Sequence, residues 1–288
     1  MSASPETSAR EATTTREFAY GARDFQRVRR MIHEHAGIAL GEGKAEMVYS
    51  RLAKRVRSLG LASFGEYLAL LEDGSHAEWE HFVNALTTNQ TEFFREAHHF
   101  PLLAAHARRI RGRSVRIWSA ASATGEEPYS IAITMCETFE TFAPPVEILA
   151  TDLDTQVLAA AREGIFPLDK VNGLSPERLR RFFLKGRGAR AGFARVRDAV
   201  RDLVDYRPMN LRDASWDLEP GFDAIFCRNV LIYFDKPTQR QVLERLRAHL
   251  APGGIYFAGH SESLLHAADL FEPCGRTAYH AAGTGPRG

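Results

Sequence analysis

The chain has 288 residues, of which 44% are hydrophobic and 25% charged, as expected for a soluble globular protein of about two domains. Its formal net charge of +1 gives no reason to expect nucleic-acid binding. The three cysteines are far apart and no apolar run reaches the length of a membrane span, so we expect a cytoplasmic protein without disulfides, a zinc site or a membrane-inserted segment.

The first part of the chain predicts a tail and a helical domain. Residues 1–17 are rich in Ser, Thr, Ala and Glu and contain almost no large apolar side chain, so we expect a disordered tail. In residues 18–88, apolar side chains recur at helical spacing, which predicts a small helical domain. Two Ser-x-x-Glu sequences, at residues 63–66 and 75–78, fit the capping box that opens a helix.

Basic residues gather on the second expected helix of this domain. Lys44, Arg51, Lys54 and Arg55 lie within about a third of the helical circumference, and few carboxylates interrupt them. A solvated face is the simpler interpretation, and a docking surface for an acidic partner is the alternative. The sequence leaves both open.

Residues 89–106 join the helical domain to the rest of the chain, and we expect a linker helix there. Its aromatic pair, Phe93 and Phe94, would pack inward while its polar groups turn toward a cleft. Those polar groups are Asn89, Thr91 and Arg95. The adjacent His98 and His99 would diverge on a helix and have no third ligand nearby in the sequence, so we expect no metal site.

Residues 107–284 alternate strands and helices, which predicts an α/β domain with a doubly wound, mostly parallel sheet. The expected strands are 115–119, 146–151, 203–207, 222–227, 254–259 and 276–281. β-prone segments around a glycine-rich stretch interrupt the alternation, which predicts a small antiparallel β insertion at about residues 184–207.

The segment Arg116–Tyr129 gives the first sign of a ligand site. It predicts a strand, a loop of small residues and a helix start, whose free N–H groups favour a carboxylate or phosphate. Only Gly125 in the loop is glycine, so the dinucleotide fingerprint is absent, and the loop alone could be a tight turn. Asp152 ends the second strand, and in a doubly wound sheet an acid there lies beside the first loop and can bind ribose hydroxyls. Together they predict a nucleoside cofactor with an anionic or zwitterionic tail.

Several blocks of sequence occur in a recognisable order. They are Thr88–Glu96, Trp118–Ala120, Thr124–Ser130, Phe222–Asp235 and Phe257–Glu262. With these blocks, from about Phe18 to Tyr279, the chain resembles the chemotaxis receptor methyltransferases, the CheR family of protein-glutamate O-methyltransferases. The resemblance implies an all-helical N-terminal domain and a class I S-adenosylmethionine-dependent methyltransferase domain. It also implies methylation of receptor glutamates for sensory adaptation, with S-adenosylhomocysteine as product.

The resemblance further implies the residues of the site. Those that would contact the cofactor are Asn89, Thr91, Arg95, Glu127, Asp152, Asn210, Leu211, Arg228 and Asn229. Whether Glu126 or Glu127 makes its contact stays open. A glutamate side chain is already ionised near neutral pH, so transfer needs orientation rather than a general base. Arg95 and Tyr233 are the catalytic candidates for that orientation. The alternatives are a salt bridge from Arg95 to a nearby Glu and a sheet-covering role for Tyr233.

The partner implied by the resemblance is the cytoplasmic domain of a chemotaxis receptor, and we expect a monomeric enzyme. Arg51, Lys54 and Arg55 are the candidates for docking on an acidic receptor helix. Some members of the family also bind a short peptide at the receptor's C-terminus through a glycine-containing loop of the β insertion. Gly186 and Gly188 look like that loop, and such a peptide would pair with an exposed strand edge.

Other functions would use the same kind of sheet. A nicotinamide oxidoreductase would want a fuller glycine fingerprint than this loop has. An adaptor that binds receptors without catalysis would not need Asn89, Arg95, Asp152 and Tyr233 together. A methyltransferase of small molecules or nucleic acids is disfavoured by the specificity of the sequence blocks and by the near-neutral charge.

Overall fold

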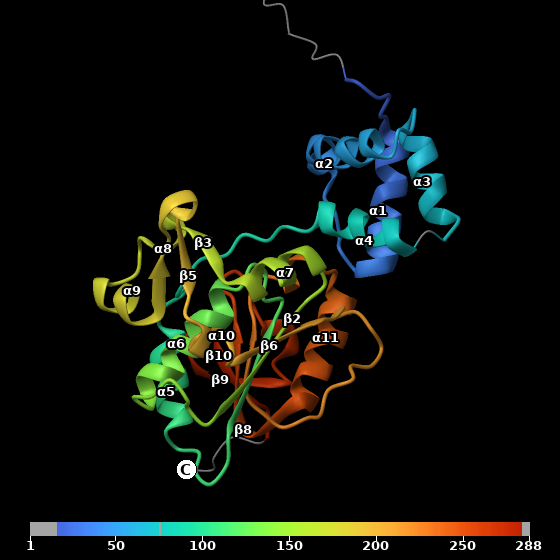
Figure 1. Cartoon of the computed structure of the whole chain (residues 1–288). Helices are drawn as coiled ribbons and strands as arrows, with labels where there is room; N and C mark the ends of the chain where they lie inside the picture. The colour runs from blue at the N-terminus through green and yellow to red at the C-terminus, as the bar shows by residue number, and fades with distance from the viewer. Residues whose placement is uncertain (1–15, 75, 284–288) are drawn as a thin grey trace, which may run out of the picture.

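The computed structural model describes residues 16–74 and 76–283, and its parts are an N-terminal group of helices and a larger α/β part (Figure 1). Some of the sequence expectations fall outside the described residues. They concern residues 1–15 of the expected disordered tail, Ser75 of the second expected capping box, and residue 284. In Figure 1 the N-terminal helices stand above α7 and α11, and an extended linker joins them to the rest of the chain. None of the helices in the described ranges is long and apolar enough to cross a membrane.

The N-terminal helices pack around one apolar cluster. They are α1 (Ala22–Ala36), α2 (Ala45–Ser58), α3 (Phe64–Glu72) and α4 (His76–Leu86). The buried side chains of the cluster, among them Val28, Leu52 and Phe82, belong to the apolar stripes that predict these helices. Ser63 caps α3 by accepting a hydrogen bond from the backbone N–H of Glu66 at 3.2 Å, as the capping box predicts.

Two of the three basic residues expected to dock a partner make contacts inside this helical domain. Arg51 donates hydrogen bonds to the backbone carbonyls of Ala85 (3.2 Å) and Thr87 (2.6 Å), at the end of α4. Arg55 makes paired hydrogen bonds of 3.0 and 2.7 Å to the carboxylate of Glu78, whose side chain is 6% exposed. Free carbonyls at a helix end and a buried carboxylate both need such donors. Lys54 is exposed, so among these three residues it is the one left available to dock a partner. That docking role stays a prediction.

The central sheet has the strand order β6-β2-β1-β7-β8-β10-β9. Its strands are β1 (Val115–Ala120), β2 (Val146–Asp152), β6 (Val204–Pro208), β7 (Phe222–Cys227), β8 (Leu250–Ala258), β9 (Phe271–Gly275) and β10 (Ala278–Ala281). From β6 to β8 the neighbours pair in parallel, and β10 is antiparallel to both β8 and β9. The predicted doubly wound, mostly parallel sheet is confirmed. The sequence did not predict β9, an edge strand that contains Pro273.

Helices cover both faces of this sheet (Figure 1). One face packs against α5 (His99–Ala107), α6 (Glu126–Thr138), α7 (Thr155–Glu163) and α10 (Asp198–Arg201), and the other against α11 (Lys236–His249). Successive residues of β1 alternate between the faces, so Ile117 joins the first apolar cluster and Trp118 the second. The chain runs from β1 through β2 to β6 and then returns past β1 to β7. Ligands of such sheets bind where the strand order reverses, here beside the ends of β1 and β7.

A second, small sheet has the order β3-β5-β4, with antiparallel pairs. Its strands are β3 (Ile165–Pro167), β4 (Phe183–Lys185) and β5 (Phe193–Val196), and α8 (Leu168–Val171) and α9 (Pro176–Phe182) lie between β3 and β4 in the chain. The predicted antiparallel insertion is confirmed, but its first strand begins at residue 165, not near 184. The chain from residue 198 on instead forms α10 (Asp198–Arg201) and β6 (Val204–Pro208). Strands of three residues carry too little alternation to be recognised in a sequence.

The linker is not helical in its first part. Residues 89–98 form extended chain and turns, and α5 begins only at His99. Phe94 and Glu96 both have φ 55°, in the left-handed region, where a right-handed helix of L-residues cannot continue. The helix expected over residues 89–106 therefore exists only in the second half of that range.

We expect Arg55→Ala to lower the stability of the helical domain by roughly 2–3 kcal/mol. The substitution leaves the buried carboxylate of Glu78 with the Tyr67 hydroxyl (2.9 Å) as its remaining side-chain donor. The matched control is Lys54→Ala, which removes the neighbouring exposed side chain and should change stability by less than about 0.5 kcal/mol. Urea unfolding measures both variants, and equal losses of stability would contradict the assignment.

Candidate functional site

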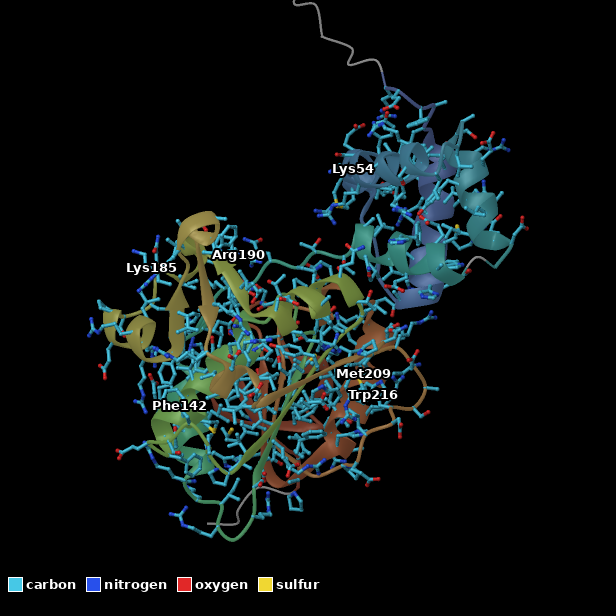
Figure 2. All side chains as sticks on the ribbon, viewed as in Figure 1. Lys54, Phe142, Lys185, Arg190, Met209 and Trp216 are labelled. Carbon is cyan, nitrogen blue, oxygen red and sulfur yellow. The ribbon has the colours of Figure 1, made fainter. Side chains whose placement is uncertain are left out.

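A cavity lies at the carboxyl ends of β1, β2 and β7, between the sheet and the helical domain. Its lining includes every residue assigned from the sequence to cofactor binding or catalysis: Asn89, Thr91, Arg95, Glu127, Asp152, Asn210, Leu211, Arg228, Asn229 and Tyr233. Met209, labelled in Figure 2, also lines it. The structure thus brings these residues together, and their individual roles stay predictions.

The helical domain forms one wall of this cavity. It supplies Ala36, Ile38, Ala39, Leu40, Lys44 and Met47 to the lining. The backbone N–H of Ala39 donates to the carbonyl of Tyr233 (2.7 Å), which ties this wall to the loop after β7. The side-chain amide of Asn210 donates to the carbonyl of His35 (3.0 Å), so this residue also joins the two parts of the chain. The cavity therefore depends on both parts.

The loop of small residues after β1 adopts an unusual backbone. Ala121 and Ala123 have φ of 67° and 47°, and Gly125 has φ of 99°. A left-handed conformation costs an alanine on the order of 1 kcal/mol, and such residues cluster at ligand sites. A Cβ at Gly125 would lie 3.0 Å from the Cβ of Ala161 and 3.1 Å from the Tyr206 hydroxyl. Glycine is thus required at position 125, and Ala121 and Ala123 bring their backbone to the cavity wall.

Asp152 lies at the end of β2 and is held by backbone N–H groups. Its Oδ2 accepts a hydrogen bond from Ala123 (2.8 Å) and its Oδ1 one from Asp154 (2.9 Å). Burial raises the pKa of Asp152 to about 6, although these hydrogen bonds oppose the rise. The two carboxylate oxygens together have about four lone-pair sites, more than these N–H groups occupy. Asp152 can therefore accept hydrogen bonds from hydroxyls of a ligand in the cavity.

Glu127 and Arg228 form an ion pair on the cavity wall, with side chains 12% and 2% exposed. Arg228 donates to Oε2 of Glu127 at 2.9 Å, and the hydroxyl of Ser119 donates to Oε1 at 2.8 Å. Glu126 also is buried, but its carboxylate accepts a hydrogen bond from the Thr124 hydroxyl (2.6 Å) and does not line the cavity. The sequence left open which of the two acids contacts the cofactor. The structure has Glu127 on the cavity wall, and its contact with a cofactor stays a prediction.

Arg95 and Tyr233 come to the cavity from different segments. Arg95 belongs to the linker and Tyr233 to the short helix η3 (Leu231–Tyr233), after β7. The guanidinium of Arg95 donates to the carbonyl of Gln90 (3.2 Å), and no carboxylate in the described part of the chain forms an ion pair with it. The adjacent Glu96 instead accepts a hydrogen bond from the backbone N–H of His260 (3.0 Å). The salt bridge considered as the alternative role of Arg95 is thus absent from the described residues.

Glu262 organises the loop after β7, and the sequence analysis gave it no role. Its Oε1 accepts hydrogen bonds from the backbone N–H groups of Val230 (2.9 Å) and Leu231 (2.8 Å), and its Oε2 one from Gly259 (2.7 Å). Burial raises the pKa of this carboxyl group, although the same N–H bonds oppose the rise. The side chain thereby ties one cavity wall to the loop after β8. In the sequence, the signal that could have identified Glu262 was its place at the end of the block Phe257–Glu262.

Asp154 is a second residue that sequence reasoning missed. Its Oδ1 caps α7 by accepting from the backbone N–H of Gln156 (2.9 Å) and Val157 (3.2 Å). Its Oδ2 accepts from the side chains of Thr87 (3.0 Å) and Asn89 (2.8 Å). The start of the linker is therefore fixed to the end of β2. An acid just before an apolar helix is an N-cap signal that could have been recognised.

The pair of adjacent histidines has a third candidate metal ligand, contrary to the sequence expectation. Atoms of Glu96, His98 and His99 that could bind a metal lie within 4.8 Å of one another. The Thr277 hydroxyl, however, lies 2.7 Å from Nε2 of His99 and 3.2 Å from Nε2 of His98. The guanidinium of Arg228 is 3.6 Å from the Glu96 carboxylate, where it would repel a cation. These contacts favour a hydrogen-bonded cluster.

Comparison with known families matches nearly the whole chain. Residues 89–280 match the family described as CheR methyltransferase, SAM binding domain, and residues 23–87 match CheR methyltransferase, all-alpha domain. These two regions are the α/β part with its linker and the helical domain.

Curated relatives are similar over most of their length. A chemotaxis protein methyltransferase 2 of Pseudomonas aeruginosa is 54% identical over 268 residues, which cover 92% of this chain and 95% of that protein. A chemotaxis protein methyltransferase of Escherichia coli is 48% identical over 266 residues, 92% and 93% of the two chains. One from Klebsiella aerogenes is 50% identical over 256 residues, 88% of each. None of these relatives is named as an oxidoreductase.

Proposed function

This chain belongs to the CheR methyltransferase family, and on that premise we propose that it transfers a methyl group from S-adenosylmethionine to glutamate side chains of chemotaxis receptors. The observation that carries the proposal is the arrangement of one cavity. Asp152 and Glu127 offer carboxylates on its sheet side, and Arg95 and Tyr233 offer hydrogen-bond donors from the linker and the loop after β7. The carboxylates of Asp152 and Glu127 suit a cationic nucleoside. The donors of Arg95 and Tyr233 suit the substrate carboxylate that receives the methyl group.

The residues of the cavity fit S-adenosylmethionine. Asp152 has acceptor capacity for ribose hydroxyls, and the backbone at Ala121 and Ala123 allows close approach. Glu127 suits the ammonium group of the methionine part. Apolar side chains, among them Leu211, suit the adenine ring. When bound, this cofactor supplies a methyl group on a positively charged sulfonium.

The proposed reaction needs no proton transfer. A carboxylate oxygen of the substrate glutamate attacks the methyl carbon, and the new C–O bond forms as the methyl–sulfur bond breaks. The electron pair of the broken bond stays on sulfur, so the products are a glutamate methyl ester and S-adenosylhomocysteine. One negative and one positive charge disappear together. A cavity that excludes water favours such a charge-cancelling step when fixed dipoles replace the lost hydration.

Arg95 and Tyr233 would orient the substrate carboxylate. Since no carboxylate of the described chain pairs with Arg95, its guanidinium is available to a substrate oxygen. Binding through Arg95 must stay modest, because a tight ion pair would stabilise the ground state more than the transition state. The hydrogen bond from Ala39 to the backbone of Tyr233 fixes the loop from which the hydroxyl would act. Catalysis would then come from alignment.

Exposed basic residues on both sides of the linker favour docking of an acidic receptor segment. Lys44 and Lys54 are exposed on the helical domain, and Lys44 also lines the cavity. Figure 2 shows Lys54 on α2, with Lys185 at the end of β4 and Arg190 in the loop between β4 and β5, across the linker. Charges of this kind mainly raise the rate of encounter and are screened over about 8–10 Å at physiological ionic strength. One copy of the chain suffices for this arrangement, and the expected monomer stays a prediction.

The small sheet offers an edge for a receptor tail peptide. β4 is the last strand of the order β3-β5-β4, and Leu184 on it and Phe193 on β5 are 41% and 40% exposed. An extended peptide would add to this edge through main-chain hydrogen bonds, with the apolar side chains beside it. A Cβ at Gly186 would lie 1.9 Å from the carbonyl oxygen of Arg190, so glycine is required for the loop that follows β4. Gly188 has φ 56°, which also suits glycine.

We expect Asp152→Asn to weaken S-adenosylhomocysteine binding by roughly 2 kcal/mol, because a charged acceptor is lost. In the unmodified protein the affinity should fall as pH drops below about 6, since the pKa of Asp152 is about 6 and protonation removes that acceptor. The side-chain amide that replaces this carboxyl group in the variant cannot titrate, so the variant's affinity should lose this pH dependence. Calorimetry between about pH 8 and pH 5 measures both effects. Unchanged affinity at every pH would refute the assignment.

Arg95→Ala should lower kcat by about 100-fold and Tyr233→Phe by about tenfold, because both residues act on transfer geometry. Affinity for S-adenosylhomocysteine should fall by much less than kcat does, since Tyr233 has no assigned cofactor contact and Arg95 supplies only one of the nine assigned contacts. Transfer of labelled methyl groups to receptor-containing membranes measures kcat. The roles are wrong if cofactor affinity collapses while turnover at saturation stays normal.

Gly186→Ala should abolish binding of a synthetic peptide with the C-terminal residues of a receptor from the same cell, because the loop after β4 must move. The matched control is Gly192→Ala, in the same loop, where an added Cβ meets nothing within 4 Å. Both variants should keep their affinity for S-adenosylhomocysteine. Equal peptide affinities for the two variants, or no binding by the unmodified protein, would count against a tail site on this edge.

A further inference from the structure

Arg95 lies in a turn with an unusual backbone. The residues on either side of it, Phe94 and Glu96, both have φ 55°, and neither is glycine. Left-handed conformations of such residues persist only where the surrounding structure over-determines them. The contacts that hold this turn therefore decide where the Arg95 side chain points.

Polar contacts from the main sheet domain hold the turn, two through its backbone and one through a side chain. The N–H of Phe94 donates to the hydroxyl of Ser130 on α6 at 2.9 Å. The carbonyl of Arg95 accepts from the guanidinium of Arg228 at 2.6 Å. The Glu96 carboxylate accepts from the backbone N–H of His260 at 3.0 Å. Each of the three residues of the turn is thus bound to a different segment.

The β insertion holds the aromatic side chains of the same segment. The ring of Phe93 packs edge-on against Phe166 of β3 and Phe183 of β4, with ring centroids 4.9 and 5.5 Å apart. The guanidinium carbon of Arg178, on α9, lies 3.9 Å from the centroid of the Phe94 ring. Within the described ranges this is the shortest of the cation-to-ring distances. A guanidinium so placed is attracted to the ring face.

Arg178 is itself fixed by an ion pair that spans two elements. Its Nε and Nη2 donate to the two carboxylate oxygens of Glu137, on α6, both at 2.8 Å. About a third of each side chain is exposed, so the pair is a bridge at the surface rather than part of the core. Because the fork of two hydrogen bonds sets the plane of the guanidinium, it also sets how that plane lies on the Phe94 ring.

We propose that Arg178 is a positioning residue, which holds the Phe94 ring in place and so fixes the turn that directs Arg95 toward the substrate carboxylate. The inference rests on the role proposed above for Arg95. It gives helix α9 of the insertion a task in the methyl transfer itself, separate from any binding of a receptor tail at β4.

Arg178→Gln should lower kcat about tenfold or more, because small displacements of an orienting group are costly. Affinity for S-adenosylhomocysteine and KM for receptor membranes should change by less than about threefold. Arg178→Lys keeps the cation and should restore part of the activity. The matched control is Arg181→Gln, on the same helix, whose guanidinium lies 5.7 and 5.0 Å from the rings of Phe142 and Phe182. Its kcat should equal that of the unmodified protein.

Arg95→Ala separates the premise from the inference. If Arg95→Ala leaves kcat unchanged, the proposed role of Arg95 fails and the inference fails with it. If Arg95→Ala lowers kcat, adding Arg178→Gln to it should lower kcat no further, since both changes act through one guanidinium. The inference would be overturned if the loss of kcat in the double variant equalled the product of the two single losses. A normal kcat in Arg178→Gln would also overturn it. Should Arg178→Gln fold poorly, Glu137→Gln releases the guanidinium without removing it and gives the same comparison.

Discussion

The buried guanidinium of Arg228 is the contact on which the site depends. Its side chain is 2% exposed, donates to Glu127 at the start of α6 and to the Arg95 carbonyl in the linker, and lies 3.6 Å from Glu96. A buried cation is stable only when it is paired and hydrogen-bonded, so these distant segments are drawn together at the end of β7. The carboxylates of Glu127 and Glu96 lie against this guanidinium, and Asp152 adds a further carboxylate to the cavity wall.

The helical domain is a wall of the site and not a separate module. Ile38 forms a β-bridge with Phe234, and His33 contacts the carboxylate of Asp235 at 2.9 Å, just beyond η3. Hydrogen bonds that Asp235 accepts from Thr238 lower its pKa to about 2, with a further contribution from His33, so this acid is charged at neutral pH. On the function proposed above, a receptor segment docked on the helical domain would lie beside this cavity.

Much of this arrangement could be predicted from the sequence, and the exceptions have physical causes. Parallel strands end at one edge of a sheet, which is why Asp152 and the loop before Glu127 could be placed together. Glu78 and Glu262 were missed as partners because hydrogen bonds between distant segments leave no local pattern. The left-handed turn at Phe94 and Glu96 interrupts the expected linker helix without a glycine or proline to signal it. The positions of the site residues follow from the structure, whereas their chemical roles stay predictions.

The most direct test of the account is to find the atom that receives the methyl group. The protein would be incubated with S-adenosylmethionine carrying a heavy-isotope methyl group and with receptor-containing membranes from the same cell, followed by mass spectrometry of receptor peptides. The account predicts the heavy methyl as an ester on glutamate side chains, and about 100-fold slower labelling when Arg95→Ala replaces the unmodified protein. Heavy methyl on nitrogen, on a small molecule or on no receptor peptide, while the protein binds the cofactor, would contradict it.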